Sequence, residues 1–226
     1  MRLLSAVLVL CLVLPWGTVL AVEGEGLGHQ PVEHLLLDIP FGIDAEECIA
    51  LVRERAGVGL NMAVDFKNSE LMFTSPSNEL RICDYPVELC ASFRDDGTLS
   101  CFTAEGHRYV LKKELEEGGK MLAAKHLQIT LVMFEKAGQN YGEAVGGIVK
   151  IQRSGLEKSL SDAKEYSLPM IDGMPDINML REIFEEDFEF LRVGFYFREG
   201  VAFSITLSQF KDSTDSLFNL FIAVGP

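Results

Sequence analysis

Residues that could do covalent or metal chemistry are few in this chain, and their spacing matches no catalytic motif. His29 and His34 lie five residues apart, which suits no common pair of helical metal ligands. A serine nucleophile needs a base and an orienting acid, but the Gly-x-Ser-x-Gly motif is absent. The glycines of 142–147 lack the Lys-Ser/Thr of a phosphate-binding loop. The sequence therefore predicts no catalytic residue, no metal site and no cofactor.

Four of the five cysteines lie beyond the amino-terminal apolar run, at Cys48, Cys83, Cys90 and Cys101. An even number in an exported chain permits two disulfides in three connectivities, and the sequence does not choose between these and free thiols. No pair has the Cys-x-x-Cys spacing of a zinc site. Cys101 is near His107 in sequence, but it is expected to point toward the core, which disfavours a cysteine nucleophile. His107 and His126 lack suitably spaced partners and are interpreted as surface or hydrogen-bonded core residues.

The residues best suited to protein contact are Arg192, Tyr196 and Arg198, because Tyr and Arg are enriched in binding hot spots. They fall on the polar side of a predicted hairpin, beside Ser204, Thr206 and Ser208. An ordinary solvated sheet face would explain the same residues, and the sequence leaves both interpretations open.

That hairpin is the clearest element of the sequence. Residues 191–197 and 201–207 alternate apolar and polar positions around the short break Arg198-Glu199-Gly200. A three-residue loop pairs apolar residues throughout on one face: Phe197 with Val201, Phe195 with Phe203, Val193 with Ile205 and Leu191 with Leu207. A slip of one residue would turn this apolar set toward water, so this register is favoured.

A second hairpin is predicted over 87–103, where Asp95-Asp96-Gly97 is a strong turn signal. A three-residue loop pairs Phe93 with Leu99 and Ala91 with Cys101. In this register Cys90 and Cys101 point to opposite faces and do not bridge each other.

Helix signals flank the hairpins. Asp44 and Asp176 are typical N-caps. The first helix runs to about Ala56 on an apolar stripe of Ala45, Cys48, Ile49, Val52 and Ala56. The second carries Ile177, Leu180, Phe184, Phe188 and Leu191 at helical spacing. Its outer glutamates, Glu182, Glu185, Glu186 and Glu189, are typical of a solvated face.

The remaining segments are assigned less directly. Residues 109–141 are predicted to be a helix ended by Gly142, although 127–134 alone would also fit a buried strand. Strands are predicted at 32–39, 60–66, 69–74, 148–152 and 217–224. Gly146-Gly147 is expected to break the chain, and 154–175 to be a linker or an exposed excursion.

The amino-terminal segment and the net charge of the chain limit the class of protein to which it can belong. Arg2 precedes an apolar run over 3–14, and Ala21 is a small residue at a suitable cleavage position, so residues 1–21 are predicted to be a secretory signal peptide. A retained anchor is the alternative, but the run is shorter than the ~20 residues of a usual span. Residues 22–31 are predicted to be a flexible lead-in. The net charge of −14 argues against nucleic-acid partners.

Together these signals predict an α+β domain over 32–226, with helices packed on one face of an antiparallel sheet. Two helix-plus-hairpin halves could be present, over 32–152 and 176–226, with 153–175 as a connector.

Two segments resemble a known group of exported bacterial domains. The capped helix from Phe41 through Gly57 and the hairpin from Phe93 to Leu99 are similar to those of β-lactamase-inhibitor-protein-like domains and small outer-membrane-assembly lipoproteins. The resemblance implies a helix-on-sheet fold and a non-catalytic binding role. Leu10 before Cys11 departs from a lipobox, so a lipid anchor is not expected. The matching positions are structural and carry over no functional residue.

The sequence thus predicts an exported, non-catalytic interaction module whose partner is another extracytoplasmic protein. It predicts no nucleic-acid partner and no stable membrane insertion after signal removal. The alternatives are an envelope-associated structural protein and a secreted hydrolase with dispersed catalytic residues.

Overall fold

The computed structural model describes residues 32–56, 60–65, 68–75, 80–82, 85–154, 162–211 and 215–226. Four helices occur in this part of the chain: α1 (Val32–Asp38), α2 (Ala45–Ala56), α3 (Lys112–Tyr141) and α4 (Ile177–Glu185). The strands of the first half are β1 (Asn61–Asp65), β2 (Glu70–Thr74), β3 (Arg81–Ile82), β4 (Tyr85–Phe93) and β5 (Leu99–Leu111). Those of the second half are β6 (Ala144–Arg153), β7 (Lys164–Leu168), β8 (Met170–Ile171), β9 (Met174–Pro175), β10 (Phe188–Phe197), β11 (Ala202–Lys211) and β12 (Asp215–Gly225).

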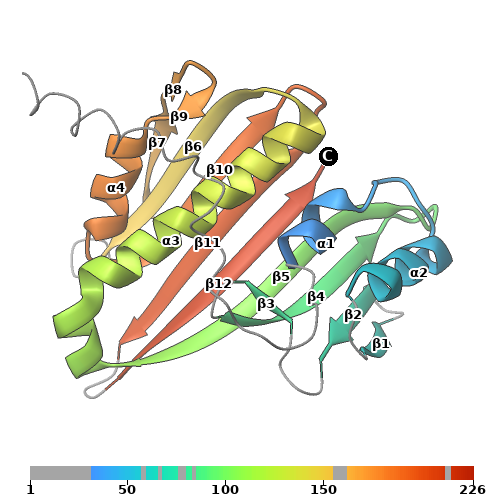
Figure 1. Ribbon diagram of the computed structural model, residues 1–226, viewed down its shortest axis with the longest axis horizontal. Helices are drawn as coiled ribbons and strands as arrows, with labels where there is room; N and C mark the ends of the chain where they lie inside the picture. Colours follow the sequence, from blue (N-terminus) through green and yellow to red (C-terminus); the bar gives the residue numbers. More distant parts are fainter. Residues whose placement is uncertain are drawn as a thin grey trace, which may run out of the picture.

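One large antiparallel sheet organises the molecule, as expected for the α+β class. Its strand order is β1-β2-β4-β5-β12-β11-β10-β6-β7, with β3 paired to β4 at the side. The last strand of the chain, β12, pairs with β5 and so joins the amino-terminal strands to the carboxy-terminal ones. Figure 1 shows the long helix α3 crossing the strands of this sheet at an angle.

Side chains alternate between two faces of the sheet, which we name the inner face and the outer face. The inner face carries Phe195, Phe203 and Ile222, all fully buried. Helix α3 packs on this face, where the ring of Phe134 lies 4.7 Å from that of Phe195. The outer face carries the alternate positions, including Arg192, Tyr196 and Phe221.

The hairpin formed by β10 and β11 has the predicted register. Leu191 pairs with Leu207, Val193 with Ile205 and Phe195 with Phe203. Phe197 donates its backbone N–H to the carbonyl of Val201, and Gly200 closes the turn with a φ of +83°. The left-handed conformation at Gly200 explains why glycine ends this loop.

Both predicted helix caps are confirmed. The carboxylate of Asp44 accepts the backbone N–H of Glu47 at 2.9 Å. Asp176 accepts the N–H groups of Asn178 and Met179. Helix α4 nevertheless ends at Glu185, so Phe188 and Leu191 belong to β10 and not to the helical stripe. Phe188 and Leu191 fit the period of a helix as well as that of a strand, because either element can bury an apolar residue. No turn signal separates α4 from β10, so the sequence does not mark where the helix ends.

The predicted register of the β4–β5 hairpin is wrong beyond its first pair. Phe93 pairs with Leu99, but a β-bulge between Ser92 and Phe93 then shifts the partners, so that Ala91 faces Phe102. Cys101 therefore lies opposite Ser92, on the outer face, and not opposite Ala91. Cys90 shares that face, because it is two residues from Ser92. A bulge adds one residue to one strand and reverses the facing of every residue beyond it.

Three further predictions are corrected. Residues 32–38 form helix α1 and not a strand, and the consecutive residues Leu35, Leu36 and Leu37 are all buried, without the alternation of a half-buried strand. Gly146 and Gly147 lie within β6, where a Cβ at Gly147 would come within 3.1 Å of the side chain of Leu168. Residues 164–168 of the supposed linker form β7, which pairs with β6 at the sheet edge.

Other predicted elements are present. Residues 112–141 form the continuous helix α3, and Gly142 follows it with a φ of +78°. Strands β1 and β2 pair as neighbours, and β12 covers the predicted final strand. The expected signal peptide, the lead-in and Cys83 lie outside the described residues. In the part of the chain that is described, no helix has the length and apolar character to span a membrane.

Candidate functional site

The outer face has a hollow of about 220 Å³ at the carboxy-terminal end of β12. Its floor consists of small residues on four neighbouring strands, among them Gly194, Ser204, Ala223 and Gly225. Arg192 and Tyr196 stand at its border, and both are exposed. The structure therefore brings together two of the three residues that the sequence singled out for protein contact.

Local packing explains why the hollow exists. A Cβ added to Gly194 would lie 3.3 Å from the side chain of Ile148, and one added to Gly225 would lie 2.9 Å from the carbonyl oxygen of Ser100. Neither position has room for a larger side chain without a shift of its neighbours. Next to this depression Tyr196 is 46% exposed, and the guanidinium of Arg192 approaches Ser204 Oγ at 3.5 Å.

Arg198 lies apart from the hollow. It sits in the turn after β10, where its Nη2 donates to Glu143 Oε2 at 2.8 Å. Its backbone N–H also donates to the carbonyl of Glu143. Both side chains of this ion pair are more than half exposed, so the pair adds little stability. Arg198 ties the hairpin turn to the start of β6.

A single row across seven strands holds most of the charge of the outer face. The pairing of neighbouring strands sets its order. Read from β4 to β7, the row is Glu88, Glu105, Phe221, Thr206, Arg192, Lys150 and Glu165. The acidic pair lies on the β5 side of the centre, and the basic pair lies on the β10 side.

Both pairs place like charges directly opposite each other, which is unfavourable in a sheet. Among the described residues, Glu88, Arg192 and Lys150 form no ion pair. Among the described side chains, only His107 comes within ion-pair distance of Glu105, with its Nε2 3.8 Å from the carboxylate. The outer face thus presents an acidic pair and a basic pair with an exposed aromatic residue, Phe221, between them, and Glu165 of the edge strand β7 lies opposite Lys150.

The cysteines of the described chain are free thiols. Burial raises the pKa of Cys48 to about 11. Cys90 and Cys101 are partly exposed on the outer face, and burial raises the pKa of each. The nearby carboxylate of Glu70 raises the pKa of Cys90 further. None of the three has the lowered pKa that marks a catalytic thiolate.

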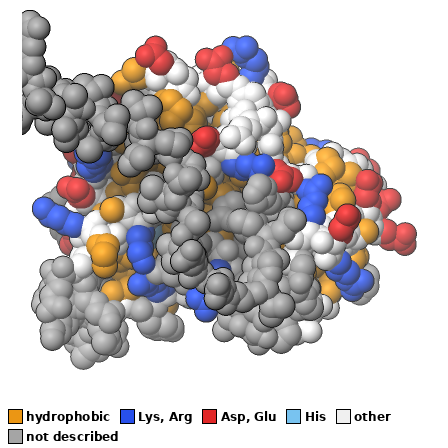
Figure 2. All heavy atoms as spheres, in the orientation of Figure 1, with side chains coloured by type: hydrophobic (Ala, Val, Ile, Leu, Met, Phe, Trp, Pro, Cys, Tyr) orange, Lys and Arg blue, Asp and Glu red, His pale blue; other side chains and the backbone are white. Residues whose placement is uncertain are grey.

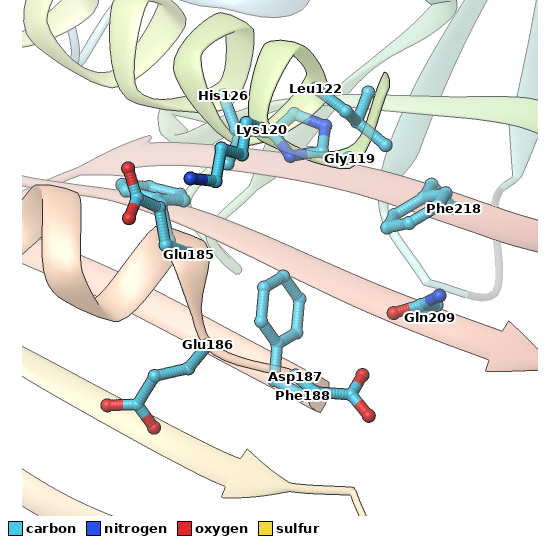
Figure 3. A pocket seen from close by; sticks show the side chains of 12 residues that line it. Gly119, Lys120, Leu122, His126, Glu185, Glu186, Asp187, Phe188, Gln209 and Phe218 are labelled. Atoms are coloured by element: carbon cyan, nitrogen blue, oxygen red, sulfur yellow. The ribbon is translucent and has the colours of Figure 1, made fainter. Parts of the chain in front are cut away.

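A second cavity, of about 260 Å³, lies under α3 and beside α4. Figure 3 shows His126 and Lys120 descending from α3, with Glu185 at the end of α4. Leu122, Phe184 and Phe218 supply apolar walls.

His126 is the one histidine among the described residues that line this cavity. It is only 3% exposed, and its Nε2 lies 2.6 Å from the hydroxyl of Tyr85. Its ring also packs between Phe184 and Phe218, with centroids 6.5 Å and 5.8 Å away. The interpretation as a hydrogen-bonded core histidine is thereby confirmed. No serine, threonine or cysteine is among the described residues that line the cavity, so His126 has no hydroxyl or thiol nucleophile beside it there.

His107 is a surface residue, as expected. Its Nδ1 lies 2.7 Å from Asn219 Oδ1 on the outer face. In the described ranges, no group of three or more His, Cys, Asp and Glu side chains is arranged to hold a metal ion.

Sequence reasoning missed the residues that complete the outer face. Glu88 and Glu105 belong to the first half of the chain, and Lys150 and Phe221 to strands that were predicted without an assignment of their faces. Alternation predicts which residues share a face of one strand. It does not predict that β5 and β12 pair and so place the acidic and basic groups on one surface.

No protein-family model, curated protein or solved structure matches this chain.

Proposed function

We propose that this protein is an exported, non-catalytic interaction module that binds another extracytoplasmic protein through the outer face of its sheet. The hollow bordered by Arg192 and Tyr196 carries this proposal, because it combines hot-spot residues with a depression that a partner side chain can fill. The proposal takes residues 1–21 as the leader that directs export, in keeping with their composition.

The proposal also assigns all four helices to the inner face, which leaves the outer face for the partner. The ring contacts of α3 with inner-face residues support this arrangement. Figure 2 views the molecule from the side of α3, where acidic and basic side chains are interspersed over the described surface. The outer face differs, because an acidic pair and a basic pair lie apart on either side of its two central strands. Separated charge steers a partner and fixes its orientation.

The resemblance to inhibitor-like exported domains agrees with a binding role. A secreted hydrolase is the weaker alternative, because the described lining of the cavity at His126 offers no hydroxyl or thiol nucleophile. An envelope-associated structural role would use the same outer face and differs only in the nature of the partner.

Affinity capture from the cell envelope and the culture medium tests this function. The tag is inserted within residues 22–28, because Pro226 at the carboxyl end borders the hollow. Arg192→Glu combined with Tyr196→Ala is expected to reduce recovery of the partner at least about tenfold, as the loss of a hot spot does.

The matched control is Arg181→Glu with Met121→Ala, which changes exposed residues on α4 and α3. This variant is expected to retain the partner. Equal recovery by the two double variants, with both folded by circular dichroism, would contradict the use of the outer face.

A further inference from the structure

We propose that the outer face pairs with the outer face of a second copy of this chain, giving a two-fold symmetric dimer of stacked sheets. This inference rests on the proposed function, because it names the partner of the same surface. A symmetric dimer uses one patch twice, so that patch must be complementary to itself.

The register of the sheet supplies that complementarity. Consider a two-fold axis that runs parallel to the strands, between β11 and β12. Rotation about this axis turns the face of one copy toward the other and exchanges positions at equal distances from the axis. Thr206 and Phe221 are then exchanged at the centre, since they pair on the two central strands.

The charges of the row are exchanged in the same way. Glu105 lies one strand beyond Phe221, and Arg192 lies one strand beyond Thr206. The axis therefore places Glu105 of one copy over Arg192 of the other. Glu88 and Lys150, one strand further out on each side, meet in the same manner. Each like-charge pair within a protomer faces the pair of opposite sign across the interface.

The neighbouring rows are complementary in size. One of these rows contains Tyr196 of β10, Ala202 of β11 and Gly225 of β12, which pair in that order. Cys101 of β5 is the next residue of the same row. The axis places the exposed ring of Tyr196 over Cys101 and the border of the hollow. In the row between, Thr103 and Gly194 exchange, as do Ala223 and Ser204. In these two rows no two large residues meet, as close packing requires.

The area is sufficient for a specific contact. A fourth row, on the other side of the charged row, contains Phe190, Ser208, Asn219 and His107. Six strands spaced about 4.8 Å apart and four rows spaced about 7 Å apart span about 24 Å by 20 Å. The two faces together would bury about 1,000 Å², which lies at the threshold for a specific interface. Twisted sheets that pack face to face cross at about 30°, which keeps the central rows in best alignment.

Sedimentation velocity with charge-exchange variants tests this pairing. The wild-type chain is expected to dimerise with increasing concentration. Arg192→Glu and Glu105→Arg each place like charges across the axis, and each should weaken dimerisation at least about 100-fold. An equimolar mixture of the two variants should form a heterodimer, because both exchanged pairs become complementary. The chain carrying both substitutions should again form a homodimer.

Recovery by mixing separates the proposal from a folding defect, because each variant is repaired only by the other. Arg181→Glu and Glu182→Arg, both exposed on α4, are the matched controls and should leave the dimer intact. A monomeric wild-type chain, a dimer insensitive to both outer-face variants, or a mixture that stays monomeric would overturn the pairing. If the wild-type chain is monomeric but Arg192→Glu abolishes capture of a different protein, self-pairing is wrong and the proposed function stands. If the wild-type chain is monomeric and Arg192→Glu leaves the capture of other proteins unchanged, both proposals fail.

Discussion

Glu88 of β4 and Glu105 of β5 are directly opposite each other on the outer face of the sheet. Arg192 and Lys150 repeat this arrangement with the opposite sign on β10 and β6. Opposed like charges destabilise a sheet by a few tenths of a kcal/mol to about 1 kcal/mol per pair. Sequences break such local rules mainly at functional sites, where a partner restores the balance.

Removing one of these charges should stabilise the isolated chain. Glu88→Gln is expected to raise the free energy of unfolding by about 0.2–1 kcal/mol, because it relieves the repulsion with Glu105. Urea denaturation at concentrations too low for self-association measures this change. Glu182→Gln, on the exposed side of α4, is the matched control and should have no resolvable effect. A clear loss of stability in Glu88→Gln would show that the repulsion is not present.

The hydroxyl of Tyr85 should contribute more to the free energy of unfolding than an exposed tyrosine hydroxyl does. Tyr85→Phe removes the partner 2.6 Å from His126 Nε2 in the buried core. Leaving a buried polar atom without that partner is expected to lower the free energy of unfolding by about 1–3 kcal/mol. Tyr196→Phe, which removes an exposed hydroxyl, should change it by less than about 0.5 kcal/mol. Equal effects in urea denaturation would argue against a structural role for the Tyr85–His126 contact.

Alkaline pH should destabilise the protein through Tyr141. Burial raises the pKa of Tyr141 to about 12, and its hydroxyl donates to the carbonyl of Leu37 at 2.6 Å. The unfolded chain releases this proton near pH 10, whereas the folded chain holds it until about pH 12, so stability falls as the pH rises between these values.

Tyr141→Phe removes that titration. The variant should be less stable at pH 8, because it loses a buried hydrogen bond, but its stability should fall less steeply above pH 10. Denaturation midpoints measured from pH 8 to pH 12 provide the comparison. Parallel profiles for the two proteins would exclude Tyr141 as a source of the alkaline loss.

The position of each thiol in the fold should determine whether it reacts with a maleimide. A short bismaleimide is expected to link Cys90 to Cys101 within one chain, because the bulge at Ser92 places both on the outer face. Cys48 is fully buried with its pKa raised to about 11, so it should stay unmodified at pH 8 until the chain unfolds. Peptide mapping identifies the linked pair. A product that contains Cys48, or no intrachain product, would contradict this arrangement.

Much of the fold follows from local signals in the sequence. The caps at Asp44 and Asp176 and the hairpin at Gly200 each depend on a few neighbouring residues, and each was predictable. The bulge at Ser92 was not, because an inserted residue has no compositional signal when both neighbours tolerate either face. Helix α1 was mistaken for a strand because a short apolar run fits a buried segment of either type.

The proposed binding face was only half predictable. Arg192 and Tyr196 lie on one hairpin, so alternation alone places them together. Glu88 and Glu105 lie about a hundred residues earlier in the chain, and they reach the same face because β12 returns to pair with β5. Such long-range pairing depends on the packing of the whole sheet and not on any local pattern.

Photo-crosslinking from position 196 tests the central claim, that the outer face is the binding surface, most directly. A benzophenone amino acid would replace Tyr196 in one chain and the exposed Met121 of α3 in another, and both would be irradiated in intact cells. The account predicts a discrete covalent adduct from position 196, lost on addition of Arg192→Glu, and none from position 121. An adduct from position 121 alone, or from neither position, would contradict it.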